Sequence, residues 1–118
     1  MTVTIDFVAF DDERDECLLV LVEQGPWPGT VEDHLRKLQE RLYGCLEAAL
    51  DGKIAERFPR SANMNLVIRV DCYDVPRDDV DAFMKMFSEA VLEMADYSPS
   101  SSQWVRSFEF EVNHDNIH

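Results

Sequence analysis

Residues 30–52 read TVEDHLRKLQERLYGCLEAALDG, and this stretch carries the most regular pattern in the chain. Its apolar side chains recur at steps of three and four residues, the period of one face of an α-helix. They are Leu35, Leu38, Leu42, Cys45, Leu46 and Ala49. Thr30 can cap the first turn, where Glu32 and Asp33 complement the helix dipole, and Gly52 is a natural stop. The sequence therefore predicts one long amphipathic helix over residues 31–51.

Two extended segments precede this helix. Residues 2–10 alternate with the period of a β-strand, which places Val3, Ile5, Phe7 and Ala9 on one face. Residues 17–22 are apolar throughout, as expected of a central strand or one covered on both sides. The polar run at residues 11–16 lacks the central glycine of a calcium-binding loop. It is interpreted as the solvated turn of a β-hairpin.

In the second half of the chain, predicted strands and a predicted helix alternate. Ile54 and Phe58 are expected to pack back onto the first helix, and residues 66–72 alternate as a third strand. Pro76 is placed to open a second helix, whose apolar stripe is Val80, Phe83, Met84, Phe87, Val91 and Met94. A serine-rich loop at residues 98–102 leads to a fourth strand, one face of which is predicted to carry Trp104, Arg106, Phe108, Phe110 and Val112.

The predicted element order is ββαβαβ. Right-handed crossovers would place both helices on one face of a mixed four-stranded sheet, which makes an α+β two-layer sandwich. Residues 1–113 are predicted to form a single domain, and residues 114–118 a polar C-terminal tail. The other face of the sheet is left without a helix, and it is either a homodimer interface or a half-exposed surface.

The charge of the chain restricts its partners. It carries 24 acidic and 11 basic side chains, a formal net charge of −13 and a pI near 4.4. Such a field repels phosphate, so we expect no binding to nucleic acid or to an anionic membrane. No apolar stretch approaches the roughly 18 residues of a membrane span. The same field would attract a basic protein partner, or it only keeps the protein soluble.

The cysteines indicate the compartment. Cys17, Cys45 and Cys72 make an odd count and fall on predicted strands or on the helical stripe, so we expect three small buried hydrophobes. No CxxC pair or Cys/His cluster predicts a metal. The N-terminus lacks the pattern of a secretion signal, and a cytoplasmic location is expected. The four glycines form no phosphate cradle, so no cofactor is predicted.

Two side chains are candidates for a binding site. His34 lies in the first turn of the long helix, beside a breaker-rich loop that holds Trp27 between two prolines. A rigid loop tryptophan is either an anchor for a partner or a lid on the core. No base or nucleophile can be tied to His34, and His114 and His118 have no third metal ligand, so no catalytic or metal-binding residue is predicted.

Several short islands resemble a bacterial family of small acidic domains of unknown function. They are Ile5-Asp6-Phe7, Trp27, His34-Leu35, Leu38-Gln39, Gly52, Phe58-Pro59 and Pro76. The resemblance extends from Thr2 to Val91 and leaves out the serine-rich loop and the last strand. It implies a bacterial origin and the same order of elements, and it assigns no role to any residue.

These observations favour a non-enzymatic interaction domain. Its partner would be a second copy of the chain or a basic protein, as in small acidic immunity proteins and inhibitors, an analogy based on fold and charge alone. The alternative is a small-molecule-binding domain or weak enzyme with a pocket near Trp27 and His34.

Overall fold

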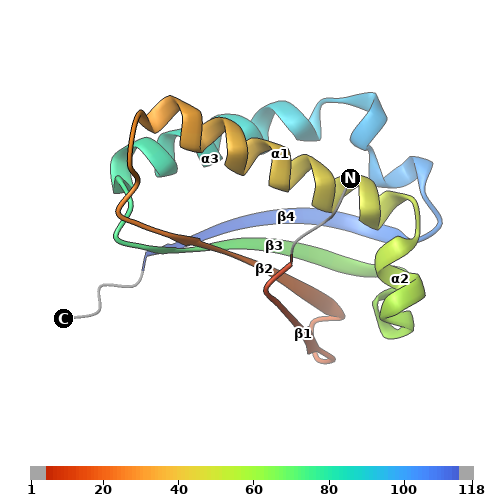
Figure 1. The fold of residues 1–118 in the computed structure, drawn as a ribbon. Coiled ribbons are helices and arrows are strands. Elements are labelled where there is room, and N and C mark those ends of the chain that lie inside the picture. The colour runs from red at the N-terminus through yellow and green to blue at the C-terminus, as the bar shows by residue number, and fades with distance from the viewer. Residues whose placement is uncertain (1–4, 115–118) are drawn as a thin grey trace.

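The computed structural model describes residues 5–114, and it has the predicted order of strands and long helices (Figure 1). The strands are β1 (Phe7–Asp11), β2 (Glu16–Gln24), β3 (Met64–Tyr73) and β4 (Val105–His114). The helices are α1 (Val31–Leu50), the short α2 (Lys53–Arg57) and α3 (Arg77–Leu92). Three single-turn 3₁₀ segments complete the list: η1 (Pro59–Ser61), η2 (Ala95–Tyr97) and η3 (Pro99–Ser101).

The sheet is mixed and has the order β1-β2-β3-β4. β1 and β2 form the predicted antiparallel hairpin, whereas β2, β3 and β4 run parallel. α1 and α3 lie on the same face of this sheet, and α2 lies beside one end of it (Figure 1). The predicted α+β sandwich with both long helices on one face is confirmed. The opposite face, which we call the open face, carries neither long helix.

The long helix forms as its sequence predicts. The Thr30 hydroxyl accepts a hydrogen bond from the Asp33 backbone N–H at 3.2 Å, which satisfies one of the free donors of the first turn. After α1, Gly52 adopts a left-handed conformation with φ of +84°, which glycine adopts without steric cost. The chain then turns at once into α2, whose Ile54 side chain is buried as expected.

The predicted face of the first strand is wrong. The chain bends at Asp6 and the strand begins at Phe7, so Ile5 and Phe7 do not belong to one alternating run. Val8 pairs with Leu19 and faces the helices, while Phe7 pairs with Val20 on the open face. A shift of one residue moves every side chain of a strand to the other face. Residues 7–10 are all apolar, so their sequence carries no signal that would fix the phase.

At the start of β4, too, the side chains face other sides of the sheet than predicted. An irregularity between Met64 and Asn65 of β3 shifts the register of β4 by one residue. Val105 is therefore buried and Arg106 exposed. Trp104 lies before the strand, its indole packed over Gly52, where an added Cβ would come within 2.6 Å of Nε1.

The C-terminal end of β4 continues one residue beyond the predicted domain boundary at residue 113. His114 belongs to the strand, and its Nε2 lies 2.7 Å from Oδ1 of Asp81 on α3. The rest of the predicted tail, residues 115–118, which includes His118, lies outside the described residues.

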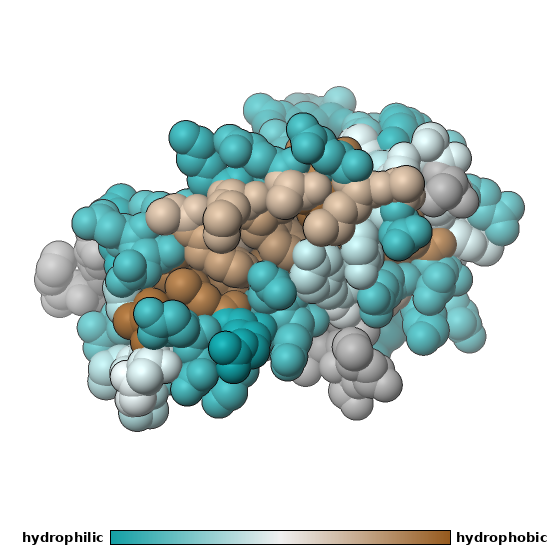
Figure 2. All heavy atoms as spheres, turned by 90° about the horizontal axis from the view of Figure 1, so that it is seen from above, coloured by the Kyte–Doolittle hydropathy of each residue, from teal (hydrophilic) through white to brown (hydrophobic). Residues whose placement is uncertain are grey.

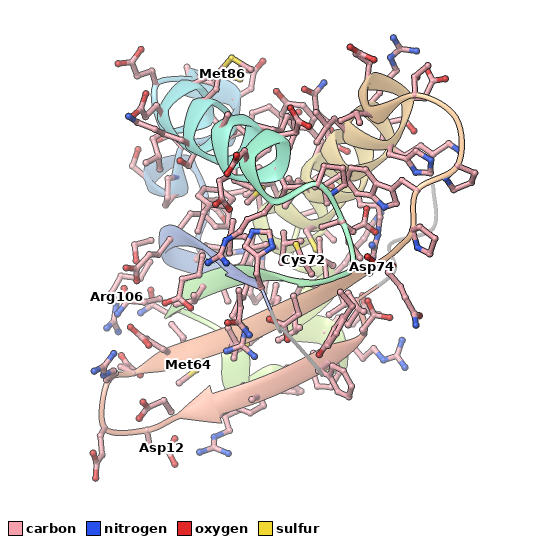
Figure 3. The ribbon with its side chains drawn as sticks, turned by 90° about the vertical axis from the view of Figure 1, so that its left-hand side faces the viewer. Asp12, Met64, Cys72, Asp74, Met86 and Arg106 are labelled. Carbon is pink, nitrogen blue, oxygen red and sulfur yellow. The ribbon has the colours of Figure 1, made fainter. Side chains whose placement is uncertain are left out.

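The core fills the space between the sheet and the long helices. It is built from one face of each central strand and the stripes of α1 and α3. Its fully buried side chains include Leu19, Leu21, Leu38, Leu42, Leu46, Leu66, Ile68, Val70 and Val80. Cys17, Cys45 and Cys72 are free and buried there (Cys72 is labelled in Figure 3). Burial raises the pKa of these thiols to about 11, 12 and 12, respectively, which keeps them protonated and unreactive at neutral pH.

Candidate functional site

The structure brings together the two residues that the sequence singled out. The Trp27 and His34 rings are stacked, with centroids 4.9 Å apart and planes 6° from parallel. Nε2 of His34 lies 2.6 Å from the carbonyl oxygen of Pro28. Trp27 is half-buried and packs against the core, as a lid would. The stack therefore holds the loop between β2 and α1 in place.

Next to this stack, Arg41 of α1 connects three parts of the chain. Its Nη1 donates to the Val22 carbonyl oxygen at 2.9 Å and to Oε2 of Glu23 at 2.7 Å, and its Nη2 lies 3.1 Å from Oδ2 of Asp6. The same Asp6 oxygen accepts a hydrogen bond from the Val22 N–H at 2.7 Å. Because each carboxylate is hydrogen-bonded to Arg41, we interpret the cluster as a clamp between α1, β2 and the start of β1.

Within this clamp, Glu23 has an altered pKa. Burial of its carboxyl group raises the pKa above the ordinary 4.5, although the Arg41 charge and hydrogen bond oppose the shift. The folded chain therefore holds this proton more tightly than the unfolded chain does. The resulting stabilisation is fully present below pH 4.5 and is lost as the pH rises through the folded-state pKa.

Glu23→Gln should remove this contribution. We expect the free energy of unfolding of wild type, minus that of the variant, to fall as the pH rises from below 4.5 to neutrality. Urea unfolding at a series of pH values measures the difference. Glu40→Gln, which removes one carboxylate at an exposed position on α1, is the matched control. An unchanging or rising difference for Glu23→Gln would contradict the account.

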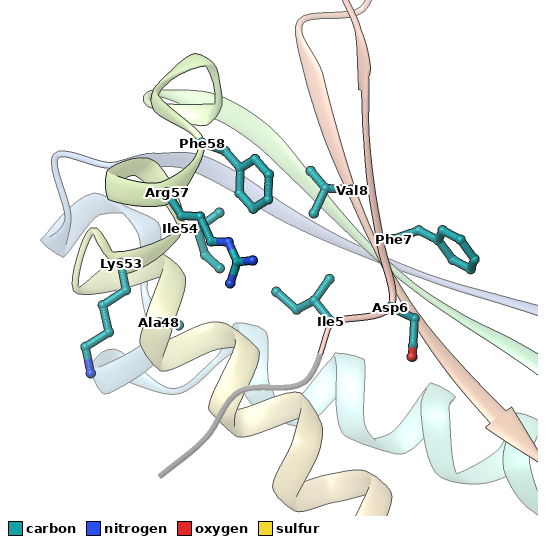
Figure 4. Close-up of a pocket in the computed structure, with 9 residues that line it drawn as sticks. All are labelled: Ile5, Asp6, Phe7, Val8, Ala48, Lys53, Ile54, Arg57 and Phe58. Atoms are coloured by element: carbon teal, nitrogen blue, oxygen red, sulfur yellow. The ribbon is translucent and has the colours of Figure 1, made fainter.

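The open face of the sheet is apolar over β1 and β2 and becomes charged over β4. One row across the four strands consists of Ala9, Leu18, Val67 and Glu109, and the next row of Phe7, Val20, Arg69 and Glu111. Phe7 is 63% exposed, and its ring lies on the side of β1 opposite Val8 and α2 (Figure 4). Arg69 is held by Asp71, its neighbour two residues along β3, at 2.8 Å.

A hollow of about 230 Å³ lies at this face. Ala9, Leu18 and Val67 line it with apolar surface, and Phe10 lines it as well. Its charged lining consists of the carboxylates Asp11, Glu16 and Glu111 and one guanidinium, that of Arg14. Within the described residues, neither Glu16 nor Glu111 makes a side-chain hydrogen bond or ion pair. The hollow thus combines apolar walls with an excess of negative charge.

A second cavity, of about 500 Å³, lies between β1 and α2 (Figure 4). Ile5 and Val8 line one side, and Ile54 and Phe58 the other. Ala48, Lys53, Arg57, Asp6 and Phe7 complete the lining. Neither cavity is lined by Trp27 or His34.

The helical side carries its own exposed apolar surface. Figure 2, which looks down on the helices, shows an apolar band crossing this side between hydrophilic margins. Met86 of α3 is 65% exposed and points outward (Figure 3). Phe83 and Phe87 of the same helix are buried beneath, with ring centroids 5.9 Å apart. Met86 therefore matches Phe7 in exposure but lies on the opposite side of the molecule.

Among residues 5–114, no group of three or more His, Cys, Asp or Glu side chains is arranged to hold a metal ion. In the same part of the chain, no helix is long and apolar enough to cross a membrane. The residues of the two cavities were not singled out by the sequence. The one available signal was the acidic run at residues 11–16, which supplies Asp11 and Glu16 to the hollow.

Residues 1–100 match the family of unknown function DUF6572. No curated protein and no solved structure matches the chain.

Proposed function

Since the chain belongs to this family of unknown function, we propose its role from its geometry: it is a non-enzymatic interaction domain that binds a basic protein partner on the open face of its sheet. The observation that carries the proposal is the hollow with apolar walls and three carboxylates. The exposed Phe7 on the same face would supply an apolar contact beside it.

The hollow suits a lysine or arginine side chain of the partner. Both residues pack their alkyl stems on apolar surface and keep the charged head near polar groups. In the hollow, Leu18 and Val67 would contact the alkyl stem. Glu16 and Glu111 would bind the charged head. Arg14 offsets one of the three carboxylates of the hollow, which leaves a negative excess. A charge-assisted hydrogen bond to the remaining carboxylates would orient the partner.

Net charge favours a basic partner over a second copy of the chain. Two copies, each with a net charge of −13, repel each other, and the open face of each copy carries Glu109 and Glu111 of β4. We therefore expect a monomer at about 100 µM in physiological salt. Size-exclusion chromatography with light scattering checks this, and a dimer abolished by Phe7→Ser would instead support self-association through the same face.

We propose the bacterial cytoplasm as the place of this function. The free, buried cysteines fit a reducing compartment, and the resemblance of residues 2–91 to a bacterial family supports a bacterial source.

The double variant Glu16→Gln/Glu111→Gln tests the role of the hollow. The immobilised protein is used to capture proteins from an extract of its own organism, and the captured basic proteins are quantified at about 50 mM and about 300 mM NaCl. We expect the double variant to lower capture about tenfold at low salt, because it removes both unpaired carboxylates. Higher salt should weaken capture by wild type.

The control removes the same charge elsewhere. Glu40→Gln/Glu89→Gln changes two exposed carboxylates on α1 and α3 and should capture as wild type does. Equal losses in the two double variants would show that net charge alone attracts the partner. Such a result, like an absence of salt-sensitive capture, would overturn the proposal.

A further inference from the structure

The cavity between β1 and α2 carries an inference that is independent of the open face. Its volume of about 500 Å³ is within the range of small-molecule sites, which are mostly apolar with a few placed polar groups. Its facing walls have this composition, with Ile5 and Val8 on one side and Ile54 and Phe58 on the other (Figure 4).

Arg57 supplies the polar group. Its guanidinium points into the opening between Ile54 and Ile5 (Figure 4). It lies over the face of the Phe58 ring, 5.8 Å from the centroid, and it has no hydrogen bond or ion pair within the described part of the chain. Lys53 lies at the rim with its side chain directed away from β1 (Figure 4).

The acidic residue of the lining does not neutralise Arg57. Oδ2 of Asp6 is already bound by the Val22 N–H and by Arg41. Arg57 is exposed, and its guanidinium faces the apolar cavity with no carboxylate partner among residues 5–114. A guanidinium in this setting is suited to bind a carboxylate in a bidentate manner.

We propose that this cavity binds a small monocarboxylate with an apolar body. The carboxylate pairs with Arg57, and the apolar part lies between the β1 and α2 side chains. A single charge is favoured over several, because the net charge of −13 repels a polyanion more strongly than a monoanion.

Octanoate and octan-1-ol, which share a chain but differ in charge, are the probes. Each is titrated into ¹⁵N-labelled protein, and amide chemical shifts are recorded. We expect octanoate to shift the resonances of Ile5, Val8, Ile54 and Phe58. Arg57→Gln should weaken octanoate binding about tenfold and leave octan-1-ol binding unchanged, because it removes a charge-assisted hydrogen bond and little apolar surface.

Arg77→Gln is the matched control, since Arg77 is exposed on α3 and does not line the cavity. It should bind octanoate as wild type does. Val8→Phe, which fills part of the cavity, should weaken the binding of both probes. Glu16→Gln/Glu111→Gln should leave octanoate binding unchanged, so a failure of the open-face proposal is separable from a failure here.

The inference is overturned if octanoate shifts no cavity resonances at about millimolar concentration, or shifts those of the open face instead. Equal octanoate affinities of Arg57→Gln and Arg77→Gln would also overturn it. The thermal midpoint of each variant verifies that the fold is intact. If Arg57→Gln does not fold, Arg57→Lys and Val8→Phe decide the question: retained octanoate binding by the first and lost binding by the second are expected.

Discussion

Gly25→Ala is expected to destabilise the protein by about 3 kcal/mol, which is near the upper end of the usual cost of overpacking. Gly25 directly follows the last residue of β2, and its N–H donates to the carbonyl oxygen of Tyr73, the last residue of β3, at 2.7 Å. An added Cβ would overlap the carbonyl oxygen of Asp74 and lie 2.7 Å from its carbonyl carbon. Both are backbone atoms, so no side-chain rotation relieves the clash, and the two strands must separate.

Urea unfolding measures this effect as a lowered midpoint. Gly29→Ala is the control, because Gly29 has φ of +82° and no atom within 4 Å of an added Cβ. Its cost is limited to the left-handed backbone, about 1 kcal/mol. If the two variants are equally stable, the close approach of β2 and β3 at Gly25 is wrong.

Leu42→Ala is expected to cost about 3 kcal/mol, because it leaves a cavity in a core that is fully closed around this side chain. Leu42 lies in the middle of the α1 stripe, and the core above the sheet depends on that stripe. Leu92→Ala is the control. Leu92 is 57% exposed near the end of α3, and the same truncation there should cost less than about 1 kcal/mol.

If Leu92→Ala lowered the stability as much as Leu42→Ala, the account that the α1 side chains form the core would be contradicted. Urea unfolding of both variants under identical conditions checks this.

The elements that the sequence predicted well are those with long, unambiguous periodicity. The stripe from Leu35 to Ala49, bounded by Thr30 and Gly52, located α1 to within one residue. The face predicted for β1 was wrong for a local reason. In β4 only the start departed from the prediction, whereas Phe108, Phe110 and Val112 lie on the core side as predicted. Residues 7–10 are apolar on both faces, and the irregularity beside Met64 depends on how β3 and β4 pair, which no single strand reveals.

The candidate surfaces were less predictable than the fold. Trp27 and His34 are seven residues apart, so their proximity followed from one loop and the first turn of α1. The hollow instead is lined by residues of all four strands, β1, β2, β3 and β4. The second cavity is lined by residues of β1, α1 and α2. Leu18 lies beside Val67 because of the register of β2 and β3. Val8 lies across the cavity from α2 because of the tertiary packing of β1 and α2. Arg57 carries no motif, and its importance derives from the absence of a carboxylate partner among residues 5–114.

Phe7→Ser compared with Met86→Ser is the most direct test of the claim that the open face binds a partner. The two side chains are 63% and 65% exposed on opposite sides of the molecule, so the substitutions remove similar apolar surface. The measurement is the amount of basic protein that each immobilised variant captures at low salt. Binding through the open face predicts a loss of at least about tenfold for Phe7→Ser and none for Met86→Ser. Undiminished capture by Phe7→Ser, or an equal loss in both variants, would contradict it.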